Sequence, residues 1–173
     1  MSLLRIVHYP EPVLLEVGRP VGAEGFGDEL SGFVDDMFET MSDAGGVGLA
    51  APQVAHSRRL FVMDTPETDD NERVRAVLID PEIVAVEGEQ VGDEGCLSFP
   101  GLFQTVRREM RVIARAFDVS GEQFEYDVRG LAARCILHET DHCDGIVFLD
   151  RMSPLKRQLA KRKIRKFQEN GKW

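Results

Sequence analysis

Two histidines four residues apart, with a glutamate directly after the first, form the most informative pattern in this chain. They are His138, Glu139 and His142 in the segment HETDH. On a helix, residues four apart lie on one face, so both imidazoles can bind one metal ion. Glu139 projects about 100° away around the helix axis, within reach of a metal-bound water. We predict a metal-dependent amide hydrolase in which this water attacks and Glu139 carries the proton to the leaving amine.

A catalytic metal site usually has three protein ligands and one open position, so a third ligand must come from elsewhere. We predict that it is Cys96, which small and turn-forming residues surround in the segment EGCLSFPG. A third histidine of the metzincin type would fall at position 148, which is Phe148. His8 and His56 stand in no supporting motif, and we expect both to be surface or structural residues.

The three cysteines of the chain include no CxxC pair. An odd number of cysteines without a secretory signal argues against a disulfide framework. We expect Cys135 to be a buried, inert thiol. Cys143 directly follows the second histidine of the motif, and we expect it to point away from the metal.

Three segments resemble the signature motifs of the peptide deformylase family: GVGLAAPQ (46–53), EGCLS (94–98) and HETDH (138–142). Their order and separations also match, and the resemblance covers the chain from about residue 3 to 168. It implies removal of the formyl group from N-formylmethionine on newly synthesised polypeptides. It also implies that Cys96, His138 and His142 bind the metal and that Glu139 is the general acid/base.

The resemblance further implies two groups that stabilise the oxyanion, the side-chain amide of Gln53 and the backbone N–H of Leu97. Fixed donors of this kind are worth about 3 kcal/mol each. The cofactor it implies is one divalent ion, Fe(II) in the cell, with Zn, Ni or Co as possible replacements. A thiolate ligand adds negative charge and lowers the Lewis acidity of the ion, so the choice of ion affects the rate.

The glycine-rich segment is expected to contact the substrate, because Gly46 and Gly48 allow a peptide to approach the backbone and pair as an added strand. It is not a phosphate-binding loop, since no Gly-Lys-Ser/Thr follows. Arg134 either lines the methionine pocket with its methylene stem or forms a salt bridge with the acidic part of the chain. The residues predicted to contact the substrate are Gly46, Val47, Gly48, Gly95, Leu131 and Arg134.

The elements that position these residues follow from sequence periodicity. Residues 28–42 predict an amphipathic helix capped by Asp28, and residues 131–142 predict the metal-binding helix, which ends near Gly145. A last helix, 154–168, opens with Pro154 and has an apolar edge of Leu155, Leu159 and Phe167. Strands are expected at 60–63, 74–79, 83–86, 110–117 and 123–128, with a polar loop at 65–71 and a hairpin turn at 119–122.

This order predicts an α+β fold, in which mostly antiparallel strands pack around a central metal-binding helix and a C-terminal helix follows. A chain of 173 residues without an internal linker fits one catalytic domain, 1–173. It has no apolar run of about 20 residues and no signal peptide, so we expect a cytoplasmic protein without a membrane partner.

The charge is unevenly distributed. Residues 154–173 hold eight Lys and Arg and one Glu, a charge of +7, whereas the other 153 residues carry −16. This basic segment either contacts an anionic partner such as the ribosome or pairs with the acidic part of the chain. No sequence-specific nucleic-acid partner is expected.

Two rival functions are consistent with parts of this pattern. A zincin-type endopeptidase would use a third His or a downstream Glu and would not need Cys96. A ribosome-associated binding module without activity would not need Gln53, Cys96 and Glu139, all of which are present.

Overall fold

The computed structural model describes residues 2–173 as an α+β arrangement with two antiparallel sheets. The larger sheet has the strand order β1-β2-β3-β6-β7, and β4 and β5 form a separate hairpin. The strands are β1 (Gly48–Ala50), β2 (Leu60–Thr65), β3 (Val74–Glu87), β4 (Gln90–Gly95), β5 (Phe103–Arg108), β6 (Arg111–Phe117) and β7 (Gln123–Arg129). The helices are α1 (Asp28–Asp43), α2 (Gly130–Cys143) and α3 (Pro154–Glu169), with short 3-10 helices at Pro12–Leu15, Ala23–Gly25, Ala51–Val54 and Phe148–Arg151.

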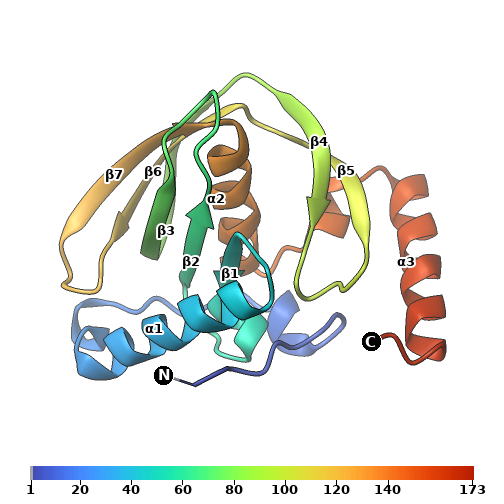
Figure 1. The fold of residues 1–173 in the computed structure, drawn as a ribbon, viewed down its shortest axis with the longest axis horizontal. Coiled ribbons are helices and arrows are strands. Elements are labelled where there is room, and N and C mark those ends of the chain that lie inside the picture. Colours follow the sequence, from blue (N-terminus) through green and yellow to red (C-terminus); the bar gives the residue numbers. More distant parts are fainter. Residues whose placement is uncertain (1) are drawn as a thin grey trace.

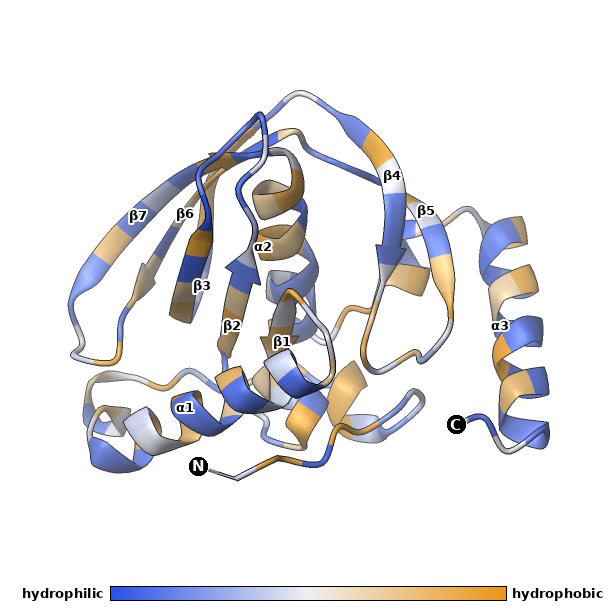
Figure 2. Ribbon diagram, viewed as in Figure 1, coloured by the Kyte–Doolittle hydropathy of each residue, from blue (hydrophilic) through white to orange (hydrophobic). Residues whose placement is uncertain are grey.

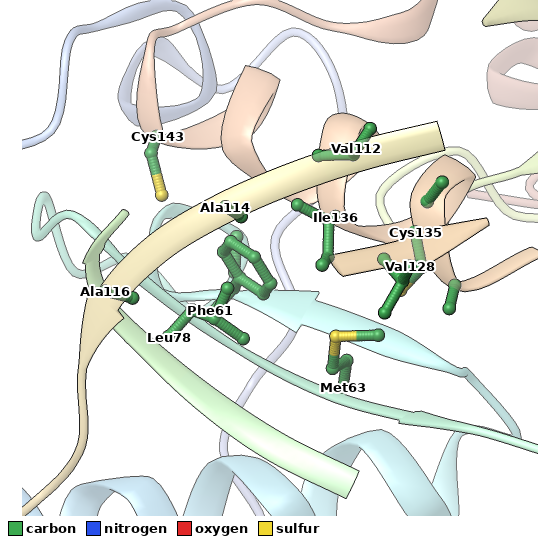
Figure 3. Close-up of a cluster of buried hydrophobic side chains, with 13 residues drawn as sticks. Phe61, Met63, Leu78, Val112, Ala114, Ala116, Val128, Cys135, Ile136 and Cys143 are labelled. Carbon is green, nitrogen blue, oxygen red and sulfur yellow. The ribbon is translucent and has the colours of Figure 1, made fainter. Parts of the chain in front are cut away.

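Helix α2 lies at the centre, between the large sheet and the β4–β5 hairpin (Figure 1). Its apolar side packs on the sheet, where Ile136 and Cys143 point toward Phe61 and Leu78 (Figure 3). The polar side of α2 carries the histidines and faces the hairpin. The predicted arrangement of antiparallel strands around a central helix is therefore confirmed.

The alternating side chains of β2 place one helix on each side of the large sheet. Phe61 and Met63 belong to the core around α2, whereas Leu60 and Val62 pack with α1. All four side chains are apolar and buried, and the strand is apolar along most of its length (Figure 2). A strand covered on both faces reads as a continuous apolar run.

A third apolar cluster lies under the hairpin and holds α3 in place. Phe99 and Leu102, which precede β5, pack there with Phe148 and with Ala160 and Ile164 of α3. The predicted apolar edge of α3 is therefore wrong in part. The helix buries Ala160 and Ile164, and the two leucines of that edge stay outside the core: Leu155 is 66% and Leu159 54% exposed.

The predicted helices and most of the predicted strands are confirmed, but four details differ. The segments 74–79 and 83–86 form one strand, β3, with a bulge at Asp80, which has a φ of 49° and accepts bonds from the Val21 and Gly22 amides. The short strand β1 lies inside the glycine-rich segment, and the β4–β5 hairpin was not predicted. Asp28 is the first residue of α1 rather than its cap, and Gly27 precedes it without a capping side chain.

The basic residues of α3 do not pair with the acidic part of the chain. Among residues 2–173, Arg157 is the only base of this helix with a hydrogen-bonded side chain, and it donates to the backbone oxygens of Leu149 and Asp150. Seven of the eight bases in 154–173 are exposed. Within the described part of the chain, no helix is long and apolar enough to cross a bilayer.

Candidate metal centre and active site

Helix α2 carries the predicted metal-binding residues in a buried position. His138, Glu139 and His142 are 7%, 4% and 1% exposed. Burying three ionisable side chains in one helical turn is costly unless partners compensate them. The residues around the helix must therefore supply partners for these three side chains.

The structure brings Cys96 to the two histidines. One donor atom from each of Cys96, His138 and His142 can be chosen so that all three lie within 4.8 Å of one another. The Cys96 sulfur is 3.3 Å from Nε2 of His142. A soft thiolate and two imidazoles fit Zn or Fe(II) better than a hard cation such as Mg²⁺. The donor set thus suits the predicted divalent metal.

Glu94 orients the first histidine, a role that the sequence analysis did not assign. Its Oε1 lies 2.6 Å from Nδ1 of His138, which leaves Nε2 of that ring to face the metal position. A carboxylate behind a ligating histidine fixes the ring and its tautomer. Its position in the motif EGCLS, two residues before Cys96 and near the end of β4, is the only sequence signal for this role.

Two buried arginines hold Glu94 in turn. Arg108 donates to both carboxylate oxygens, at 2.8 and 2.9 Å, and Arg134 donates at 2.7 Å. Burial alone would raise the pKa of Glu94, but the hydrogen bonds from Arg108 and His138 hold it well below its usual range. Glu94 is therefore a permanent anion behind His138.

Asp141, next to the second histidine, has no hydrogen bond to an imidazole among the residues described. It accepts instead from Arg108, at 2.7 Å, and from Arg151, at 2.6 and 3.0 Å. Nδ1 of His142 is buried without a hydrogen-bond partner among the residues described. Asp141 thus ties α2 to the hairpin through Arg108 and leaves the second histidine without a carboxylate behind it.

Glu139 has the environment of a group that exchanges protons. Burial raises the pKa of its carboxyl from 4.5 to about 7. Its Oε2 has no hydrogen-bond partner among residues 2–173. Gly48 lies against it, because a Cβ at that position would be only 2.5 Å from Oε1. This close approach, rather than free rotation of the backbone, requires a glycine in β1.

Gln53 lies on the other side of the cysteine. Its Oε1 accepts a bond from the Ala50 amide at 2.9 Å, and this contact fixes the side chain. Its Nε2 is 3.5 Å from the Cys96 sulfur and 3.3 Å from the Ser98 hydroxyl. The amide N–H groups of Gln53 therefore lie next to Cys96 and Ser98, and its role toward the oxyanion stays a prediction.

A cavity of about 510 Å³ opens onto this cluster. Arg134 forms the salt bridge with Glu94 that one of the two alternatives predicted, and it also lines the cavity. Its contact with a methionine side chain stays a prediction. Val47 stands at the rim and is 40% exposed. All the residues predicted to contact the substrate line the cavity, together with Leu97: Gly46, Val47, Gly48, Gly95, Leu131 and Arg134.

The remaining histidines and cysteines lie outside the cluster of three donors. His8 packs near Trp173 and His56 against Phe33. Cys143 is fully buried in the core on the sheet side of α2 (Figure 3), so it points away from the metal position as predicted. Cys135 is also buried, and burial raises the pKa of its thiol well above the usual range. Both are poor nucleophiles.

Comparisons with known proteins agree with this site. Residues 3–158 match the family model described as polypeptide deformylase. A peptide deformylase from Chromobacterium violaceum is 49% identical over 96% of both chains. The crystal structure of a peptide deformylase from Legionella pneumophila has a TM-score of 0.87 and 42% identity over 98% of each chain. The Met-Ala-Ser-bound class I type b peptide deformylase from Acinetobacter baumannii has a TM-score of 0.81 and 32% identity, over 87% of this chain and 99% of that one.

Proposed function

The chain belongs to the polypeptide deformylase family, and from that premise we propose that it hydrolyses the formamide of N-formylmethionyl peptides at one divalent ion held by Cys96, His138 and His142. The observation that carries this proposal is the cluster of three metal donors beside the buried carboxyl of Glu139. Of these residues, Cys96, His138 and Glu139 line one cavity. The ion, when bound, supplies the Lewis acidity that makes water a nucleophile at neutral pH. We assign Fe(II) to the enzyme in the cell, with Zn, Ni or Co as replacements.

Residues of the chain transfer the proton and stabilise the oxyanion. Glu139 takes the proton from the attacking water and gives it to the leaving amine, a task suited to a carboxyl with a pKa near 7. The amide of Gln53 and the backbone N–H of Leu97 stabilise the charge that develops on the formyl oxygen. The restraint of Gln53 by Ala50 supports its role, because a donor that is already oriented loses little entropy in the transition state.

The substrate is proposed to bind as an extended strand. Strand β1 is at the end of the large sheet, so its outer edge has no strand partner among the residues described. A peptide laid along this edge can add a strand and direct its methionine side chain toward Leu131 and Arg134. The complex of the Acinetobacter baumannii relative with Met-Ala-Ser supports a peptide of this kind as the ligand.

The direct test is formate release from formyl-Met-Ala-Ser by protein prepared anaerobically and loaded with Fe(II). We expect turnover and one equivalent of tightly bound metal. Cys96→Ala should lose both the metal and the activity, because two imidazoles alone form an incomplete site. Cys143→Ala, which removes a thiol from the opposite side of α2, is the matched control and should keep both.

Two outcomes would reject this function. Stoichiometric metal in Cys96→Ala would favour the zincin-type endopeptidase, which does not need the thiolate. A correctly metallated wild-type protein that releases no formate would favour the binding module without activity.

The exposed bases of α3 are proposed to hold the enzyme at the ribosome, in the cytoplasm, where formylated chains emerge. The family model ends at residue 158, inside α3. We treat residues 1–173 as one catalytic domain, and we propose that its last segment, the basic residues 154–173, contacts the ribosome. Within residues 2–173 the bases of α3 form no ion pair, which supports this proposal, since free cations can exchange counterions with RNA phosphate.

Replacing Lys161, Arg162 and Lys166 together by Gln should weaken ribosome binding and reduce its salt dependence, the slope of log K against log salt falling by about two to three units. Turnover of short peptides should not change. These three side chains are exposed, so the apolar contacts of α3 remain. Arg5, Arg107 and Arg129 are exposed bases elsewhere, and replacing them by Gln is the control. Equal ribosome affinities for the two triple variants would contradict the proposal.

A further inference from the structure

Phe103 is a large apolar side chain at the active-site cavity to which the proposed mechanism gives no role. It is the first residue of β5, is 66% exposed, and lines the cavity that holds Cys96 and Glu139. An aromatic ring left in water at the rim of a binding cavity indicates contact with a ligand. Val91 is 60% exposed on the same hairpin but does not line this cavity. Phe103 and Val91 are therefore similarly exposed, but only Phe103 lines the active-site cavity.

The ring of Phe103 is held over the backbone of its neighbour in β4. Phe103 lies directly opposite Gly95 in the hairpin. A Cβ at Gly95 would be 2.6 Å from Cε1 of Phe103, so the ring occupies the space that a side chain there would fill. The aromatic side chain therefore covers the strand at the point where the cavity opens.

The alternation of β4 tells which face of the hairpin Phe103 occupies. Successive side chains of a strand point to opposite faces. Glu94 points toward α2, where it bonds to Arg134, and a Cβ at Gly92 would also meet Arg134. Gly95 and its partner Phe103 therefore face the other way, toward the outside of the hairpin.

Successive side chains of a peptide bound in an extended conformation must also point to opposite faces. If the methionine side chain points inward to Leu131 and Arg134, the side chain of the next residue points outward, to the face of Phe103. We propose that Phe103 binds the side chain of the residue after formylmethionine and favours a large apolar residue at that position. This inference rests on the proposed deformylation, because it assumes that the peptide lies along β1 and β4.

The experiment compares kcat/KM for formyl-Met-Leu-Ser and formyl-Met-Ala-Ser, both with the Fe(II)-loaded enzyme. Apolar contacts of this size change specificity by about tenfold, and we expect wild type to prefer the leucine peptide by that factor. Phe103→Ala should bring the ratio close to one, mainly through KM, because the contact is made equally in the ground and transition states. Val91→Ala, an equally exposed apolar residue on the same face, should keep the wild-type ratio.

A second variant tests the same contact by reversing its chemistry. Phe103→Lys should raise the ratio of formyl-Met-Asp-Ser to formyl-Met-Leu-Ser by about tenfold or more relative to wild type, since a cation replaces an apolar surface. Ratios unchanged in both Phe103 variants, or a change seen only with formyl-Met-Ala-Leu, would overturn the assignment to the second residue. If wild type releases formate from none of these peptides, the proposed function fails instead, and this outcome is distinguishable from the failure of Phe103.

Discussion

Glu139→Gln is expected to lower kcat on formyl-Met-Ala-Ser by about a thousandfold or more, within the usual range for loss of a general acid/base. Gln has the same shape but cannot accept the proton of the attacking water or deliver it to the amine. The unpaired Oε2 of Glu139 and its raised pKa indicate that the carboxyl is kept for this transfer rather than for structure. Steady-state kinetics with equal metal loading would measure the loss.

The stability of the metal-free protein provides an independent check on Glu139. Its pKa is raised by burial from 4.5 to about 7, so its contribution to stability is most favourable below pH 4.5 and is lost as the pH rises through 7. The metal-free Glu139→Gln variant should therefore gain stability over wild type across this range, by roughly 3 kcal/mol at pH 8. Glu125→Gln, at an exposed position of β7, should show no such gain. An active Glu139→Gln enzyme, or a variant less stable than wild type at pH 8, would contradict the assignment.

Glu94→Gln is expected to weaken metal binding by about 10- to 100-fold, because the carboxylate behind His138 fixes its ring and its tautomer. The same change leaves Arg134 and part of Arg108 buried without a counter-charge. Removing one partner of a buried ion pair costs about 3 to 5 kcal/mol. We therefore expect both a lower metal affinity, measured by competition with a chelating dye, and a lower urea midpoint for the metal-free protein.

Glu89→Gln is the matched control for Glu94→Gln. Glu89 precedes the same hairpin and also pairs with an arginine, Arg107, but the side chains are 54% and 70% exposed. Exposed pairs contribute little to stability, about 1 kcal/mol or less. If both variants bound metal like wild type, Glu94 would have no role behind His138.

Much of the site could be predicted because its chemistry is encoded in short segments. His138, Glu139 and His142 share one helical turn, and the helix follows from local periodicity. The roles of Cys96 and Gln53 were predicted from short motifs, which can be recognised in the sequence without knowledge of the fold. Helices α1 and α3 were predicted for the same reason, since an apolar stripe or a basic run with Pro154 at its start is visible locally.

The remaining features depend on contacts between distant segments. Arg108 is 14 residues from Glu94 and 33 from Asp141, and no local pattern shows that it bonds to both. Arg151 bonds to the same aspartate, from which it lies 10 residues away. Strands β4 and β5 were missed because Gln, Gly, Asp and Thr make them polar, and their pairing with each other compensates for weak strand propensity.

The position of Cys96 on a hairpin separate from the large sheet has a consequence for the lifetime of the protein. Cys96 and His138 are 42 positions apart, so an ion bound to both would act as a reversible cross-link between the hairpin and α2. Such a link stabilises the folded chain in proportion to the logarithm of free metal concentration. Loss of the ion would leave the hairpin held on α2 by the ion pairs of Glu94 and Arg108, so the apolar cluster beneath it would be exposed more often. The supply of metal would then govern how long a molecule escapes proteolysis as well as how fast it turns over.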